Sequence, residues 1–248
     1  MDFYIKRRNG FLTIAAYLII FYVIASVIAA IMIDIIGTSD QIFLSSLHNL
    51  VVYIILFGAL IFINYKEIIL DFKKLKEKKK PILIILASFG IFYTITIVTN
   101  FLVSEVETYA NIVSKLMNID PIIKTTSENQ TSIEAMLSGS AMIPMILSAA
   151  IIGPICEELV FRKAFFNICK TKEMGILLSS LCFGLIHITS SIAAGYNFIS
   201  IFLTALPYVA SGAAFGIIYI KNDCNILVPT IVHMLGNTIS IIGVIFLT

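Results

Sequence analysis

The chain has 248 residues, of which 59% are hydrophobic and 13% are charged, and its formal net charge is +2. Its mean hydropathy of +1.00 excludes an ordinary water-soluble domain, because much of this apolar side chain would have to lie on the surface. The apolar runs are long and continuous, whereas the strands of a membrane β-barrel alternate between apolar and polar residues. The composition therefore predicts an all-α integral membrane protein.

Seven apolar segments are long enough to span a bilayer, and we predict that each is a transmembrane helix. The first follows "MDFYIKRR" and is too long for the core of a signal peptide, so we expect it to be retained. The fifth is the shortest. The segments cover about residues 11–36, 42–65, 82–103, 137–163, 175–190, 198–220 and 226–248.

Lysine and arginine residues predict the orientation of the helices, because short cytoplasmic loops carry an excess of them. With the N-terminus inside, 15 of the 17 basic residues fall on the cytoplasmic side, and only Lys115 and Lys124 fall on the other. We therefore expect a multi-pass protein of the cell membrane, with a cytoplasmic N-terminus and an external C-terminus.

The two longest connections are chemically different. The segment 66–81, "KEIILDFKKLKEKKKP", has Ile68, Phe72 and Leu75 on one helical stripe among lysines, as expected of a short helix on the inner leaflet. A charged loop that only fixes the topology is the alternative. The other connection, about 104–136, is acidic and polar and is predicted to be a loop.

Three short polar patterns fall within the last four predicted spans. Each contains two residues four positions apart, which places both on one face of a helix. The residues are Glu157, Glu158 and Arg162 in 137–163, Phe183 and His187 in 175–190, and His233 and Asn237 in 226–248.

The energetic cost of these side chains indicates that they face one another. Each charged residue at the centre of a membrane helix costs roughly 2.5–3.5 kcal/mol. Unpaired, the whole set would cost on the order of 10 kcal/mol, which is comparable to the stability of a domain. The sequence therefore predicts a shared polar cavity, and Pro154, which can bend the fourth span, is consistent with one.

Individual roles follow from the spacing. Arg162 lies one turn beyond Glu158 and is expected to hold that carboxylate ionised. Glu157 points about 100° away, so it is left free to act as a general base. His187 could share or orient the same water, and His233 and Asn237 could donate hydrogen bonds to an oxyanion.

Each residue taken alone has a simpler interpretation. The Glu158–Arg162 pair could be a structural clamp, Asn237 could join two helices, and Phe183 could pack against an imidazole. A single membrane histidine is more often a packing residue than a ligand, and His48 is interpreted in that way. The joint occurrence in three spans favours a site.

In this order, the motifs E-E-x-x-x-R, F-x-x-x-H and H-x-x-x-N resemble those of the CAAX prenyl protease and bacteriocin-processing (CPBP, or Abi) family of intramembrane endopeptidases. The context P-x-x-E-E-L-x-F-R around the first motif is also intact. The resemblance covers roughly 137–248, and we expect a single membrane domain over 1–248 in which 1–136 provides accessory spans and loops. It implies a conical polar cavity that opens to the cytoplasm and the hydrolysis of peptide bonds there.

In that family, the residues matching Glu157 and His187 are taken to activate water, and those matching His233 and Asn237 to stabilise the oxyanion. Members are often labelled metalloproteases, but this chain lacks H-E-x-x-H. We expect a mechanism that requires no metal; a zinc ion held by Glu157, His187 and His233 is the alternative.

Substrates and competing functions follow from the same resemblance. The Ile- and Lys-rich composition suggests an AT-rich bacterial genome, so we expect leader or signalling peptides, bacteriocin precursors or other membrane proteins as substrates, and no nucleic acid. The alternatives are a catalytically silent interaction or immunity protein on the same scaffold, and an ion pathway. An ion pathway is disfavoured because the end of the seventh span, "TISIIGVIFLT", is apolar.

Overall fold

The computed structural model describes residues 3–36, 40–121 and 123–247, and within these ranges the regular structure is helical, with no strand. Within these described ranges, seven helices are long and apolar enough to cross a membrane, which confirms the predicted all-α polytopic bundle. Residue 248, the predicted end of the last span, lies outside the described residues. The seven are Tyr4–Ile36, Gln41–Glu77, Pro81–Leu116, Gly139–Ile168, Lys172–Ala193, Phe198–Lys221 and Leu227–Phe246.

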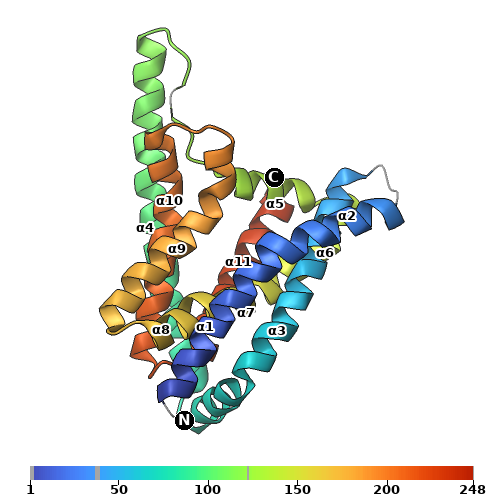
Figure 1. Cartoon of the computed structure of the whole chain (residues 1–248). Coiled ribbons are helices and arrows are strands. Elements are labelled where there is room, and N and C mark those ends of the chain that lie inside the picture. The colour runs from blue at the N-terminus through green and yellow to red at the C-terminus, as the bar shows by residue number, and fades with distance from the viewer. Residues whose placement is uncertain (1–2, 37–39, 122, 248) are drawn as a thin grey trace.

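The first three spans are longer than predicted. α3 has 37 residues and α4 has 36, or roughly 54–56 Å each at 1.5 Å per residue, against a hydrocarbon core of about 30 Å. The end of α4 that carries Leu116 rises beyond the rest of the bundle (Figure 1). The elements are α1 (Phe3–Ile19), the π-helical turn η1 (Ile20–Ile24), α2 (Ala25–Ile36), α3 (Gln41–Glu77) and α4 (Pro81–Leu116).

Both long connections therefore differ from the prediction. Residues 66–77 continue α3, so they form neither a separate surface helix nor a loop. The predicted apolar stripe is divided, because Phe72 is exposed whereas Ile68 and Leu75 pack against core clusters. The predicted loop 104–136 begins inside α4 and ends in the short helix α5 (Glu128–Met136).

The fourth span is an α-helix interrupted by two π-helical turns, one on each side of the adjacent glutamates. Such turns are rare and often occur at functional sites. The proline predicted to bend this span, Pro154, lies in the first turn of α7. The segments are η2 (Gly139–Ala141), α6 (Met142–Ile146), η3 (Leu147–Ile152), α7 (Gly153–Glu158), η4 (Leu159–Ala164) and α8 (Phe165–Ile168).

Three regular helices complete the bundle: α9 (Lys172–Ala193), α10 (Phe198–Lys221) and α11 (Leu227–Leu247). α9 is six residues longer than the predicted fifth span, because its polar ends are helical as well. α9 and α10 pack against each other through small residues. A Cβ added to Gly212 would lie 2.9 Å from the Cα of Ser180, so this backbone approach requires glycine.

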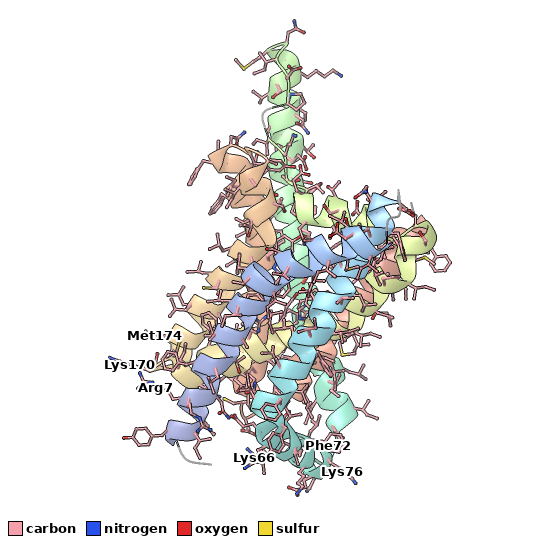
Figure 2. The ribbon with its side chains drawn as sticks, turned by 45° about the vertical axis from the view of Figure 1, so that its right-hand side comes forward. Arg7, Lys66, Phe72, Lys76, Lys170 and Met174 are labelled. Atoms are coloured by element: carbon pink, nitrogen blue, oxygen red, sulfur yellow. The ribbon has the colours of Figure 1, made fainter. Side chains whose placement is uncertain are left out.

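The arrangement positions the fourth span at the centre. In Figure 1 it runs obliquely across the bundle from α6 to α8, and it contacts α1, α3, α9 and α11. The N- and C-termini lie toward opposite ends of the bundle. Arg7, Lys66, Lys76 and Lys170 gather at the end that carries the N-terminus (Figure 2), as the predicted charge asymmetry requires.

Candidate active site

The predicted pair of Glu158 and Arg162 is present and completely buried. Arg162 Nε lies 2.9 Å from Glu158 Oε2, and both side chains are 0% exposed. The guanidinium carbon lies 4.9 Å from the ring centre of Phe183 and 5.0 Å from that of Phe215. Neither Nη atom has a hydrogen-bond partner among the described residues. The two rings and Glu158 therefore provide the environment of this cation.

His233 connects the two glutamates of the first motif. Its Nδ1 lies 2.9 Å from Glu158 Oε1, and its Nε2 lies 3.8 Å from Glu157 Oε2. A carboxylate can only accept, so Nδ1 carries the proton that is donated to Glu158. The ring stacks on Phe215 with 4.6 Å between ring centres. The first and third motifs thus meet in one buried cluster.

His187 lies between two aromatic rings beside this cluster. The ring centre of Phe183 is 4.4 Å away and that of Tyr208 is 4.5 Å away. Nδ1 donates to the backbone oxygen of Phe183 at 2.8 Å, since a carbonyl only accepts, so Nε2 is left to face other groups. Glu157, Arg162 and His233 are all close enough to interact with His187 electrostatically.

Asn237 lies one turn beyond His233 on α11, but its amide is directed to the fourth span. Nδ2 donates to the backbone oxygen of Ala149, 2.8 Å away, within the π-helical turn η3. This contact joins two helices, as the simpler interpretation of Asn237 expects. The second hydrogen of the same amide group is not used by that bond.

The motifs did not predict that α3 contributes to the site. Tyr53 donates a hydrogen bond from its hydroxyl to Glu157 Oε1, over 3.1 Å. Tyr208, on α10, packs against His187, and its hydroxyl lies 2.8 Å from Ser127 Oγ. Neither tyrosine belongs to a motif with regular spacing, so only the packing of the helices identifies them. His48, interpreted as a packing residue, contacts the backbone oxygen of Ala25.

The side chains named for zinc do not form a metal-ligand set in this arrangement. Across residues 3–36, 40–121 and 123–247, no group of three or more His, Cys, Asp or Glu residues is placed to hold a metal ion. His233 uses Nδ1 to bind Glu158, and its Nε2 is 3.8 Å from Glu157.

A second buried polar cluster lies where α3 meets the end of the fourth span. Lys163 Nζ is 2.6 Å from Asp71 Oδ2 and 3.4 Å from Glu67 Oε2, and all three side chains are buried. Asn225 donates from Nδ2 to the backbone oxygen of Asp71. The sequence pattern did not predict these contacts, because Glu67 and Asp71 lie about 90 residues before Lys163 in the chain.

Comparisons with known proteins agree with the position of these motifs. Residues 139–239 match the model of the family described as type II CAAX prenyl endopeptidase Rce1-like. No solved structure is matched by the chain.

Three curated bacterial proteins are similar to part of the chain. An uncharacterized protein of Mycoplasma capricolum is 33% identical over 104 residues, which are 42% of this chain and 28% of the relative. The putative membrane peptidase YdiL of Bacillus subtilis is 31% identical over 113 residues, which are 44% of this chain and 41% of the relative. The UPF0177 protein YajF of Lactococcus lactis is 30% identical over 80 residues, which are 32% of this chain and 36% of the relative.

The chain thus spans less than half the length of each of these relatives. The matched region contains all seven residues of the three motifs and both π-helical turns of the fourth span. The similarity of residues 139–239 to the Rce1-like family of CAAX prenyl endopeptidases confirms the family resemblance that the three motifs predicted.

Proposed function

We propose that the chain is an intramembrane endopeptidase that hydrolyses peptide bonds of membrane-associated peptides or proteins. The observation that carries the proposal is the buried cluster in which His233 lies between Glu157 and Glu158. This cluster falls in the segment similar to an endopeptidase family, and one relative is named a putative membrane peptidase. Burial of so many ionisable groups is costly and is typical of functional sites in membranes.

In the proposed reaction, Glu157 is the general base. Its carboxylate takes a proton from a water molecule, and the water oxygen adds to the carbonyl carbon of the substrate. The carbonyl oxygen becomes an oxyanion. As it reforms the carbonyl, the C–N bond breaks, and Glu157 returns the proton to the departing nitrogen. His187, whose Nε2 is not used by the bond to Phe183, helps to orient the water.

The oxyanion requires hydrogen-bond donors, and the tautomer of His233 is relevant here. Because Nδ1 donates to Glu158, a neutral ring has only a lone pair on Nε2. We therefore infer that His233 acts as an imidazolium, with a carboxylate near each nitrogen to stabilise the charge. Glu158 and Arg162 support His233, and Asn237 provides the second donor.

No metal ion is assigned a step in this scheme, and we propose that the reaction requires none. The substrates proposed are leader or signalling peptides, bacteriocin precursors and segments of other membrane proteins. A prenylated peptide is also tested as a substrate, because the matched family is described as a prenyl endopeptidase. We also propose that the end of the bundle with the N-terminus faces the cytoplasm, since the basic residues gather there.

The test uses the purified full chain in proteoliposomes with two quenched fluorogenic peptides, one farnesylated with a CAAX end and one anchored by an apolar helix. Wild type is expected to cleave at least one, and Glu157→Gln is expected to reduce kcat by about 10³-fold or more at unchanged abundance. Cys169→Ser, a change outside the cluster, serves as the matched control. Analysis of bound metal and assay after chelation test the absence of a metal requirement.

Peptidomics of membranes from cells that express wild type or Glu157→Gln would then identify natural substrates. Undiminished cleavage by Glu157→Gln would rule out this residue as the base. Full complementation of a deletion phenotype by the same variant would favour the alternative, a catalytically silent interaction or immunity protein.

A further inference from the structure

Tyr53 brings a second helix into contact with the proposed base. It lies on α3, 104 residues before Glu157, and its hydroxyl donates to Oε1 of that carboxylate over 3.1 Å. The other oxygen, Oε2, is the one that faces His233 Nε2 at 3.8 Å. The two oxygens of Glu157 are therefore in different environments, one hydrogen-bonded and one open toward the histidine.

The tyrosine ring is held in place from two sides. Phe21 meets it edge to face, with 5.3 Å between ring centres. On the other side is Gly153, where an added Cβ would lie 3.5 Å from the Cζ of Tyr53. The same Cβ would lie only 2.6 Å from the backbone oxygen of Ser148, so a larger residue at position 153 would disturb the turn next to the site. The hydroxyl therefore has little freedom to leave Glu157.

We propose that Tyr53 is a positioning residue that fixes the carboxylate of Glu157 and leaves Oε2 as the oxygen that removes the proton from water. This inference rests on the proposed function, because it assigns a role within that reaction. The hydroxyl bond restrains rotation of the carboxylate, and a bond to the charged form stabilises that form. The proton of the water then moves to Oε2, next to His233, where the oxyanion also forms.

A purely structural role would depend on the ring and not on the hydroxyl. Tyr53→Phe keeps the ring that packs on Phe21 and Gly153 and removes only the donor. The matched control is Tyr65→Phe on the same helix, because that side chain is 45% exposed and lies next to Lys66, away from the buried cluster.

The experiment has two readouts on wild type, Tyr53→Phe and Tyr65→Phe. The first is kcat and KM for whichever peptide the wild type cleaves. The second needs no substrate: dicyclohexylcarbodiimide modifies protonated carboxylic acids, and mass spectrometry measures labelling of Glu157 against pH, with Glu157→Gln as the blank.

For Tyr53→Phe we expect kcat to fall about tenfold with KM within twofold, because the reacting group is misplaced while substrate binding is kept. Labelling of Glu157 at a given pH should increase, because the carboxylate has lost the hydrogen bond from Tyr53. Tyr65→Phe should match wild type both in its kinetic constants and in the labelling of Glu157.

A labelling curve and a kcat of Tyr53→Phe that coincide with those of wild type would overturn the inference, as would a kcat loss equalled by Tyr65→Phe. If wild type cleaves neither peptide, the proposed function fails, and an unshifted labelling curve would then show separately that Tyr53 does not control Glu157. If Glu157→Gln is inactive while Tyr53→Phe is unchanged in both readouts, only the role of Tyr53 is lost.

Discussion

The ammonium group of Lys163 lies 2.6 Å from Oδ2 of Asp71, and both side chains are buried between α3 and the end of the fourth span. Asn9 and Asn167 contact Glu67, the second carboxylate of this cluster. The ion pair therefore joins α3, which carries Tyr53, to the fourth span, which carries Glu157.

Replacing Lys163 by Met should destabilise the protein strongly. The change leaves Asp71 and Glu67 buried without their cation, and removal of one partner of a buried pair costs about 3–5 kcal/mol. Thermal unfolding of the detergent-solubilised protein measures the effect. Lys73→Met on α3, the helix that carries Asp71 and Glu67, is the control, because Lys73 is exposed. Equal melting temperatures for both variants would contradict the structural role of the pair.

Two glycines in membrane helices should respond differently to replacement by alanine. At Gly212, a new Cβ would lie 2.9 Å from the backbone of Ser180, so α9 and α10 would have to separate, at a cost of about 1–3 kcal/mol. At Gly58, nothing lies within 4 Å of the same atom, and no loss is expected. Unfolding in detergent compares Gly212→Ala with Gly58→Ala. An unchanged Gly212→Ala protein would show that the close approach is unnecessary.

Asp40 should make stability depend on pH. The pKa of its carboxyl lies below its ordinary value, chiefly because the backbone N–H of Phe43 donates to it at the start of α3, with a second bond from Ser140. A lowered folded-state pKa gives stabilisation that is present above the unfolded pKa of about 4 and is lost as the pH falls through that range. Asp40→Ala should therefore melt below wild type at pH 7.

The difference between Asp40→Ala and wild type should shrink as the pH is lowered from 7 toward 3, because the carboxyl becomes protonated first in the unfolded state and then in the folded state. Asp120→Ala, which removes another exposed carboxylate, provides the control at both pH values. A difference that is the same at pH 7 and pH 3 would show that the side chain acts through something other than its charge.

The proposed orientation places the two termini on opposite sides of the membrane, as an odd number of spans requires. Alkaline phosphatase fused after residue 248 should be active, and green fluorescent protein at the same position should stay dark, because the first folds only outside the cytoplasm and the second only inside it. A fluorescent green fluorescent protein fusion together with an inactive phosphatase fusion would show that the C-terminus faces the cytoplasm, opposite to the proposed orientation.

Hydropathy alone was enough to place the seven spans, because continuous apolar runs are required wherever a helix meets lipid. It failed at the ends of α3 and α4, where helix continues through polar residues. Hydropathy reports what surrounds a helix and not where its hydrogen-bonded turns stop. Glu67 and Asp71 lie in such a polar extension, and the pattern could not reveal that they face Lys163.

In the site, too, some contacts could be predicted from the sequence and others could not. The i, i+4 spacing was sufficient to pair Glu158 with Arg162, because one helix fixes that geometry locally. The contact of His233 with both glutamates needs two helices to pack, and was predicted only as a shared cavity. Tyr53 and Tyr208 were missed, since a single tyrosine in an apolar span has no distinguishing periodicity. The conical cavity and the roles of the site residues stay predictions.

The π-helical turns beside Glu157 and Glu158 also affect how this protein should be compared with others. A wide turn accommodates one residue more than an α-helical turn, so residues before η3 and after η4 do not share a single rotational phase. A homologue that lacks one of these turns could keep every motif letter and yet present its glutamates in a different direction. Alignments of the fourth span should therefore allow a one-residue gap at 147–152 and at 159–164.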